Sequence, residues 1–111
     1  MDPDKTRICV LYDIYGELLP PSVSEFIDLY YNNDLSLSEA AENTGISRQG
    51  VRDGIMRGTK LLEEYEEKLG LYKKYKENNS AVTKIRAELD VADLDAAVKE
   101  KIVSLLGTLS F

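Results

Sequence analysis

The segment 35–55, "LSLSEAAENTGISRQGVRDGI", decides the fold of this chain. Its small and apolar residues have the spacing of two helices joined at a glycine: Leu37, Ala40, Ala41, Gly45, Ile46, Val51 and Ile55. Gly45 suits the left-handed backbone of a tight turn, because it carries no Cβ. Ala41 is small where two helices cross closely, and the three β-branched residues after the turn are expected to anchor the second helix on the first. The pattern predicts a helix-turn-helix.

Both helices of this motif carry signals for where they begin. Ser36 is followed three residues later by Glu39, which is the spacing of a capping box. Ser47 stands where it can cap the next helix. The apolar spacing of that helix continues to about Lys68, and Gly70 is a natural stop. We therefore expect the second helix to be long.

The residues before the motif predict two further helices. The first is expected over about 6–15, and Pro20-Pro21 interrupts the chain after it. Ser22 and Glu25 have the spacing of another capping box, so we expect the second helix to begin near Ser22 and to end at 32–34. No stretch of the chain alternates for long as a strand does, which predicts an all-α protein.

The C-terminal part is expected to add two helices. Residues 78–80, "NNS", are interpreted as a linker or cap before a helix marked by Val82, Ile85 and Leu89. Asp93 is expected to cap a last helix with a broad apolar face, which must cover the core or a second subunit. We therefore predict a helix-turn-helix domain at 1–70 and a helical extension at 71–111, with self-association of the chain.

Composition excludes several classes of function. The 111 residues contain no histidine and a single cysteine, Cys9, so neither His/Cys metal sites nor Ser-His and Cys-His catalysis are available. The spacing of Cys9 indicates a buried, inert thiol in a reducing cytoplasm. The many carboxylates leave an acidic metal site open, although they are better explained as solvated surface. The start lacks the pattern of a secretion signal, and apolar runs are too short for a membrane span. We expect a cytoplasmic, non-enzymatic protein without a cofactor or metal.

Charge is unevenly distributed along the chain, whose net charge is −6. Residues 8–47 contain seven acids and no base, whereas residues 48–60 contain four bases and one acid, Asp53. On a helix, Gln49, Arg52, Asp53, Met56 and Lys60 are expected to face away from Val51 and Ile55, with Arg48 and Arg57 on the two flanks. Arginine, glutamine and lysine are the donors that read bases and phosphates in a DNA groove. The predicted nucleic-acid-binding residues are Arg48, Gln49, Arg52, Met56, Arg57 and Lys60.

The sequence resembles two known groups. Residues 35–62 are similar to the region-four helix-turn-helix of sigma factors, which reads promoter DNA. Residues 12–75 resemble the YlxM family of small bacterial proteins more closely, through "YGELL", "LYYNNDLSLSEAAE", "GISRQGVRD" and "LLEEYEEKLGLY". The genes of that family lie beside those for the signal recognition particle protein and its receptor. The resemblance implies a regulatory role near co-translational targeting, with DNA binding presumed from the fold and with the particle's protein or RNA as further candidate partners.

Two interpretations of the function stay open. In the first, the chain binds nucleic acid, although its acidic neighbours predict weak, salt-sensitive binding unless a dimer adds contacts. In the second, the helix-turn-helix is a retained scaffold, and the acidic surface contacts a basic protein of the targeting pathway.

Gly50, Gly54 and Gly58 depart from the family, which usually has alanine, asparagine and a longer residue there. Each glycine costs about 1 kcal/mol relative to alanine in a helix. We interpret them as neutral changes tolerated by packing elsewhere. The alternatives are a close approach of another helix at Gly54 and Gly58, or a helix that becomes ordered only on binding.

Overall fold

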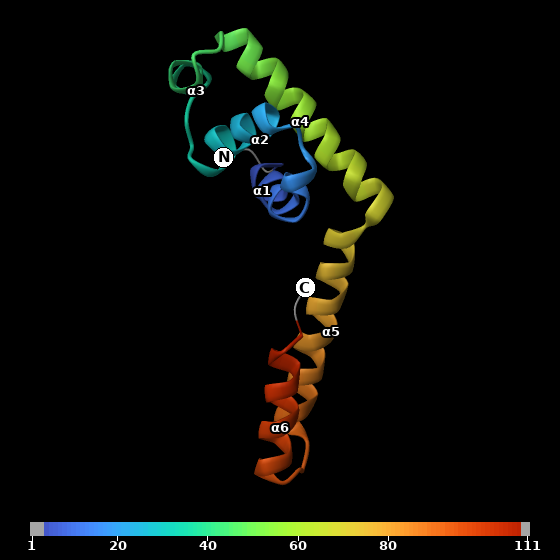
Figure 1. Cartoon of the computed structure of the whole chain (residues 1–111). Helices are drawn as coiled ribbons and strands as arrows, with labels where there is room; N and C mark the ends of the chain where they lie inside the picture. Colours follow the sequence, from blue (N-terminus) through green and yellow to red (C-terminus); the bar gives the residue numbers. More distant parts are fainter. Residues whose placement is uncertain (1–3, 110–111) are drawn as a thin grey trace. The chain divides into compact units, whose positions relative to one another are not determined.

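The computed structural model describes residues 4–109, and all their regular secondary structure is helical. Six α-helices follow one another (Figure 1): α1 Asp4–Tyr15, α2 Pro21–Ile27, α3 Leu37–Thr44, α4 Arg48–Leu69, α5 Leu71–Val91 and α6 Ala96–Gly107. A 3₁₀ turn at Gly16–Leu18 follows α1, and a π-helical segment at Asp28–Asn32 extends α2. The predicted all-α class is confirmed. None of the described helices is both long enough and apolar enough to cross a membrane.

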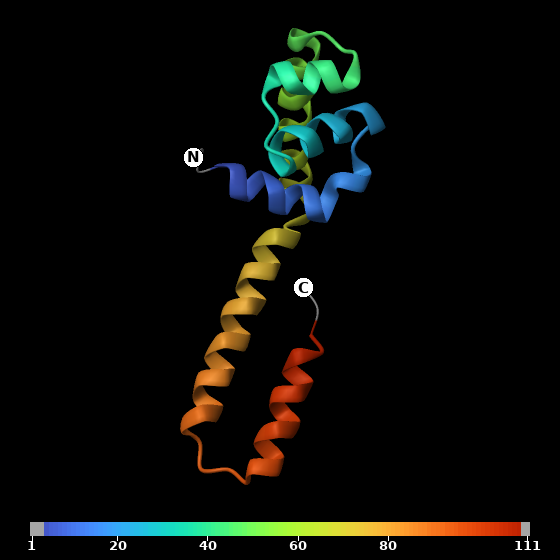
Figure 2. The same ribbon diagram turned by 90° about the vertical axis from the view of Figure 1, so that its left-hand side faces the viewer.

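The chain divides into two compact units, Met1–Tyr72 and Lys73–Phe111. In the first unit, α1, α2 and α3 all pack against α4, and they gather on one side of it (Figures 1 and 2). The core formed there consists of Ile8, Leu11, Tyr15, Leu19, Val23, Phe26, Ile27, Ala40, Val51, Ile55 and Leu62. The long helix α4 is therefore the element on which the rest of this unit is assembled.

The helix-turn-helix is formed by α3 and α4, and its local signals are confirmed. The Ser36 Oγ accepts a hydrogen bond from the Glu39 amide at 3.1 Å, and the Glu39 carboxylate accepts one from the Ser36 amide at 3.0 Å. Gly45 ends α3 with a φ of 72°. The Ser47 Oγ accepts from the amide of residue 50 at 3.0 Å, and Gly70 ends α4 with a φ of 62°.

Two details of the motif differ from expectation. Ile46 is 44% exposed, so it does not anchor α4 as Val51 and Ile55 do. Cys9 is only half-buried, and its Sγ lies 3.7 Å from the carbonyl oxygen of Tyr31. Both residues lie at the border of the core.

The interpretation of Gly54 and Gly58 as neutral changes is wrong. A Cβ at Gly54 would lie 2.3 Å from the Cδ2 of Phe26. A Cβ at Gly58 would lie 2.8 Å from a side-chain carbon of both Val23 and Ile27. Real carbon atoms pack at about 3.5–4.0 Å. The two glycines therefore permit the close crossing of α2 over α4, which was the alternative.

The start of α2 also differs from the prediction. The helix begins at Pro21, and the N-cap residue is Pro20, which makes no side-chain hydrogen bond. The predicted capping box between Ser22 and Glu25 is therefore wrong. Proline suits the first helical position because its φ is already helical and the missing amide would have no partner there. The sequence of α2 and the π-helical segment ends at Asn32, as expected.

In the second unit, the predicted break at residues 78–80 is wrong, because α5 runs through them without interruption. The segment contains no glycine or proline, and asparagine and serine lower helix stability without ending a helix. The last helix is capped by Asp95, whose carboxylate accepts from the Ala97 amide at 3.0 Å, and not by Asp93. Among the residues of this unit that the structure describes, only Leu89 is buried, whereas Val98 and Leu105 of α6 are 45% and 62% exposed.

Candidate nucleic-acid interface

The first half of α4 carries all six predicted binding residues, and every one of them is exposed: Arg48, Gln49, Arg52, Met56, Arg57 and Lys60. The opposite side of the same turns is buried, since Val51 is 0% and Ile55 is 6% exposed. Side chains in a helix are spaced about 100° apart. The fold thus holds one side of α4 in the core and leaves the other side open to a large partner.

The backbone under these residues is firmly held. Phe26 and Ile27 of α2 contact α4 where the two glycines remove side chains, and Phe26 is only 7% exposed. Leu62, further along α4, is fully buried. A helix docked at several points along its length presents its outer side chains in a defined arrangement, which a binding surface requires.

One hydrogen bond within this surface joins Gln49 and Asp53. The Gln49 Nε2 donates to the Asp53 Oδ1 at 2.9 Å, and both side chains are exposed. Asp53 is the only acid among residues 48–60. The sequence pattern places Asp53 on the outer side of the helix, but it was not among the predicted binding residues. Its spacing of four residues from Gln49, one helical turn, is the signal that indicates the pair.

A hollow of about 330 Å³ lies where α3 meets α4, lined by Leu37, Arg48, Gln49 and Arg52. The two arginine side chains give it a positive border, and guanidinium groups bind phosphate through paired hydrogen bonds. Leu37 was not among the predicted site residues, because an apolar residue at the start of α3 was assigned to the core.

The preceding helix α3 carries negative charge, since Glu39 and Glu42 are exposed. The pKa of Glu39 is lowered by the hydrogen bonds it accepts from the backbone amide and side chain of Ser36. Its carboxylate is therefore charged at neutral pH. This charge opposes the approach of phosphates to α3 and confines the favourable region to α4.

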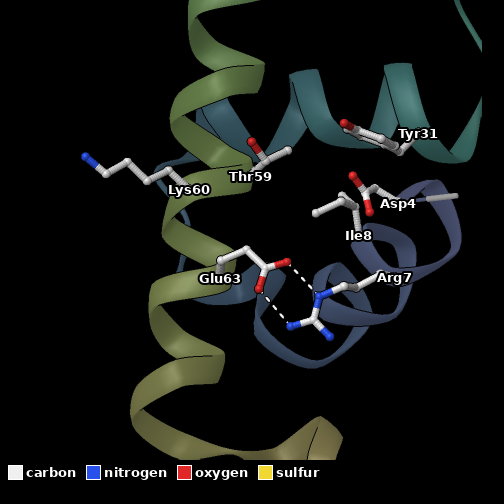
Figure 3. A pocket seen from close by; sticks show the side chains of 7 residues that line it. All are labelled: Asp4, Arg7, Ile8, Tyr31, Thr59, Lys60 and Glu63. Carbon is white, nitrogen blue, oxygen red and sulfur yellow. Dashed lines mark hydrogen bonds and ion pairs between the residues drawn. The ribbon is translucent and has the colours of Figure 1, made fainter. Parts of the chain in front are cut away.

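A second hollow, of about 380 Å³, lies between α1 and α4 (Figure 3). Arg7 donates from Nε and Nη2 to the two carboxylate oxygens of Glu63, both at 2.7 Å. This pairing raises the pKa of Arg7 and lowers that of Glu63. Figure 3 shows Lys60 extending away from the hollow. The charges of Arg7 and Glu63 compensate each other, and the pair joins α1 to α4. Lys60 is not part of this pair, and its exposed side chain belongs to the outer surface of α4.

The end of α4 is tied to α1 by a buried tyrosine. The Tyr15 hydroxyl donates to the Glu66 carboxylate at 2.7 Å and accepts from the Leu71 amide at 3.1 Å. Glu66 also accepts from the Tyr72 amide at 2.9 Å. Burial and the bond to Glu66 raise the pKa of Tyr15. Within residues 4–109, no three acidic, cysteine or histidine side chains gather as a metal site would require.

Comparison with known proteins places this arrangement in a family. Residues 3–102 match the family model described as "UPF0122: Putative helix-turn-helix protein, YlxM / p13 like". A UPF0122 protein of Listeria monocytogenes is 40% identical over 100 residues, which cover 89% of this chain and 91% of the relative. A UPF0122 protein of Caldanaerobacter subterraneus is 46% identical over 86 residues, covering 78% and 74%. One of Acetivibrio thermocellus is 44% identical over 87 residues, with the same coverage. With its exposed α4 surface on a helix-turn-helix, the chain belongs to the UPF0122 family of YlxM/p13-like proteins.

Proposed function

We propose that this chain is a non-enzymatic regulatory protein that binds DNA through the outer side of α4. The observation that carries the proposal is the exposure of all six predicted side chains on the second helix of a helix-turn-helix. In such motifs this helix enters the major groove, and its first turns contact base edges. Arg48, Arg52, Arg57 and Lys60 supply the positive charge, while Gln49 and Met56 supply contacts to bases.

The charge of this surface predicts how the binding depends on salt. If all four bases contact phosphates, the logarithm of the affinity falls with the logarithm of salt concentration with a slope of roughly −3.6. Affinity then decreases roughly 100-fold between 50 and 200 mM salt. Binding by a single copy is accordingly weak at physiological salt, and additional contacts from a second copy or another protein would strengthen it.

The setting we propose is the signal recognition particle pathway in the cytoplasm. Membership of the YlxM/p13-like family supports this, because genes of YlxM proteins lie beside those for the particle's protein and its receptor. Regulation of that pathway by a DNA-binding protein, or direct contact with the particle's protein or RNA, is consistent with the exposed basic surface. A region-four-like mode of DNA reading fits the length and exposure of α4.

The test is a double substitution, Arg52→Ala with Arg57→Ala, measured by fluorescence anisotropy on duplex DNA over a salt series. Loss of two phosphate contacts lowers the slope of the salt dependence by roughly 1.8 and abolishes DNA binding at moderate salt. The matched control is Lys84→Ala with Arg86→Ala, which makes the same change in net charge at exposed positions of α5. Equal affinity of the wild type and the Arg52/Arg57 variant for DNA would refute the assignment.

A second function is supported by the acidic segment 8–47. Seven acids and no base occur over residues 8–47, and the α3 carboxylates of Glu39 and Glu42 are exposed. Such a surface suits a basic protein of the targeting pathway, with the helix-turn-helix as a scaffold. A pull-down from cell extract with and without nuclease separates the two functions. Capture of targeting proteins that survives nuclease favours the protein-interaction function.

We further propose that the active form is a homodimer. The second unit exposes large apolar side chains, among them Ile85, Val98 and Leu105 at 44%, 45% and 62%. Association of two copies would cover such side chains and double the number of basic side chains available to DNA. Sedimentation over a concentration series tests this, and a constant monomer mass up to high micromolar concentration would refute it.

A further inference from the structure

The one acid within the basic surface of α4 lies at the centre of its outer side. Asp53 follows the fully buried Val51 by two residues, which places it about 200° around the helix from the core contact. Gln49 precedes Val51 by two residues and lies about 160° from it, on the same outer side. Arg52 lies closer to the flank. A DNA groove that receives the outer side of α4 therefore faces Asp53 and Gln49, with Lys60 on the same side two turns further on.

A carboxylate at this point needs a specific partner. DNA carries a high density of negative charge, so an acid in the groove opposes binding unless it accepts a hydrogen bond from a base. In the major groove the exocyclic amino groups are the donors, namely N4 of cytosine and N6 of adenine. Guanine presents only acceptors there, and thymine presents an acceptor and a methyl group. A carboxylate therefore selects against guanine and thymine at the position that it faces.

The bond from Gln49 makes this selection sharper. A free glutamine amide reads a donor or an acceptor equally well, because its oxygen and nitrogen exchange places by a rotation. Here the nitrogen faces the Asp53 carboxylate at 2.9 Å, and the reverse orientation would bring two acceptors together. The amide is therefore held with its nitrogen toward Asp53. The second Asp53 oxygen and the Gln49 oxygen, both acceptors, remain for the partner.

We infer that the Asp53–Gln49 pair is a specificity device, which directs α4 to a cytosine or an adenine, and not a guanine or a thymine, on the DNA strand that Asp53 faces. The inference rests on the proposed DNA binding and adds to it the base class that is read. Asp53 contacts the amino group, and Gln49 is held in the matching orientation beside it. The four basic side chains of the surface supply affinity that does not depend on the DNA sequence.

The experiment selects binding sites from a random duplex library at low salt, using wild type, Asp53→Ala and Asp53→Asn. The wild type enriches one base pair in one orientation at one position of the selected site, by roughly tenfold over the other three arrangements. Both variants lose this preference, and Asp53→Ala binds unselected DNA at least as tightly as the wild type. Because Asp53 is exposed, the variants keep their fold. Circular dichroism verifies this.

A control and a chemical substitution complete the test. Glu67→Ala makes the same charge change at another exposed position of α4, 14 residues further on, and leaves the preference intact. In the selected duplex, purine replaces adenine or pyrimidin-2-one replaces cytosine, which removes the amino group. The substitution that weakens wild type by roughly tenfold, with no effect on Asp53→Ala, identifies which base is read.

The outcomes distinguish this inference from the function on which it rests. DNA binding by the wild type with the same preference in Asp53→Ala, or with an affinity that removal of the amino group does not lower, overturns the role of the pair and leaves DNA binding intact. Failure of the wild type to bind any duplex at low salt overturns both. Loss of the cytosine or adenine preference in Asp53→Ala alone, with Glu67→Ala unchanged, supports the inference.

Discussion

Gly54→Ala is the substitution that tests most directly how α4 is held. In an open helix this change stabilises by about 1 kcal/mol, because alanine loses less conformational freedom. In this fold the new Cβ would lie 2.3 Å from the Cδ2 and 2.7 Å from the Cε2 of Phe26. A normal contact is about 3.5 Å, so the ring or the helix must move by more than about 1 Å.

The size of the effect follows from the surroundings of the ring. Phe26 is 7% exposed and Ile27 beside it is 0% exposed, so the ring has no open space to enter. Overpacking of a closed core costs about 1–3 kcal/mol, and so large an overlap belongs at the upper end. After the gain from helix propensity, we expect a net loss of about 2 kcal/mol. The melting temperature of the first unit then falls by roughly 8–16 °C.

The assay is urea unfolding followed by the near-ultraviolet signal of tyrosine, since the chain has no tryptophan. Six of its seven tyrosines precede Lys73, so the signal reports on the first unit. Gly50→Ala is the control, because its Cβ would lie 2.9 Å from the Cγ2 methyl of Ile46 and 3.1 Å from the Oγ of Ser47, and Ile46 is 44% exposed, so its side chain has open space to turn into. We expect that variant to be neutral or stabilised by up to about 1 kcal/mol.

The reasoning is refuted if Gly54→Ala stabilises the protein as much as Gly50→Ala does. A double-mutant cycle adds a second test. Phe26→Leu shortens the side chain at the point of overlap, so Gly54→Ala should cost less in that background than in the wild type. Equal costs in both backgrounds would show that the ring of Phe26 is not what limits the site.

Three further predictions use the same unfolding measurement. Ser36→Ala removes the cap of α3 and costs about 1 kcal/mol, whereas Ser22→Ala changes stability by less than about 0.5 kcal/mol, because Ser22 caps no helix. Tyr15→Phe costs about 1–3 kcal/mol by leaving a backbone amide and a carboxylate without their hydroxyl partner. The folded-state pKa of Tyr15 is raised, so wild-type stability is lost as pH rises above about 10, and the variant lacks that component of the loss. The folded-state pKa of Glu63 is lowered, so the stability that Glu63 contributes is present above its unfolded pKa of about 4.3 and is lost as pH falls through the folded pKa. This loss is small, because the Glu63 side chain is 44% exposed, and it is absent in Glu63→Gln.

Several parts of the fold that depend on neighbours in the chain were predictable. Ser36 and Ser47 cap helices through amides three residues away, and Gly45 and Gly70 end helices by their own backbone conformation. These four features are encoded within one helical turn. The capping box at Ser22 and Glu25 has an equally local pattern but does not form, because α2 begins at Pro21. The exposure of the six predicted α4 side chains follows from the same periodicity once Val51 and Ile55 are buried. The bond from Gln49 to Asp53 is equally local.

Tertiary structure alone decided what the glycines of α4 do. Gly54 and Gly58 have the helix cost of any glycine, and only the position of α2, some 30 residues earlier, turns the missing side chains into a close crossing. Likewise Tyr15 meets Glu66 across 51 positions, and Arg7 meets Glu63 across 56. A contact between distant residues depends on where the packing of the whole core brings two helices together. Local propensity and spacing carry no record of that position, so the sequence predicts the helices and the core determines how they cross.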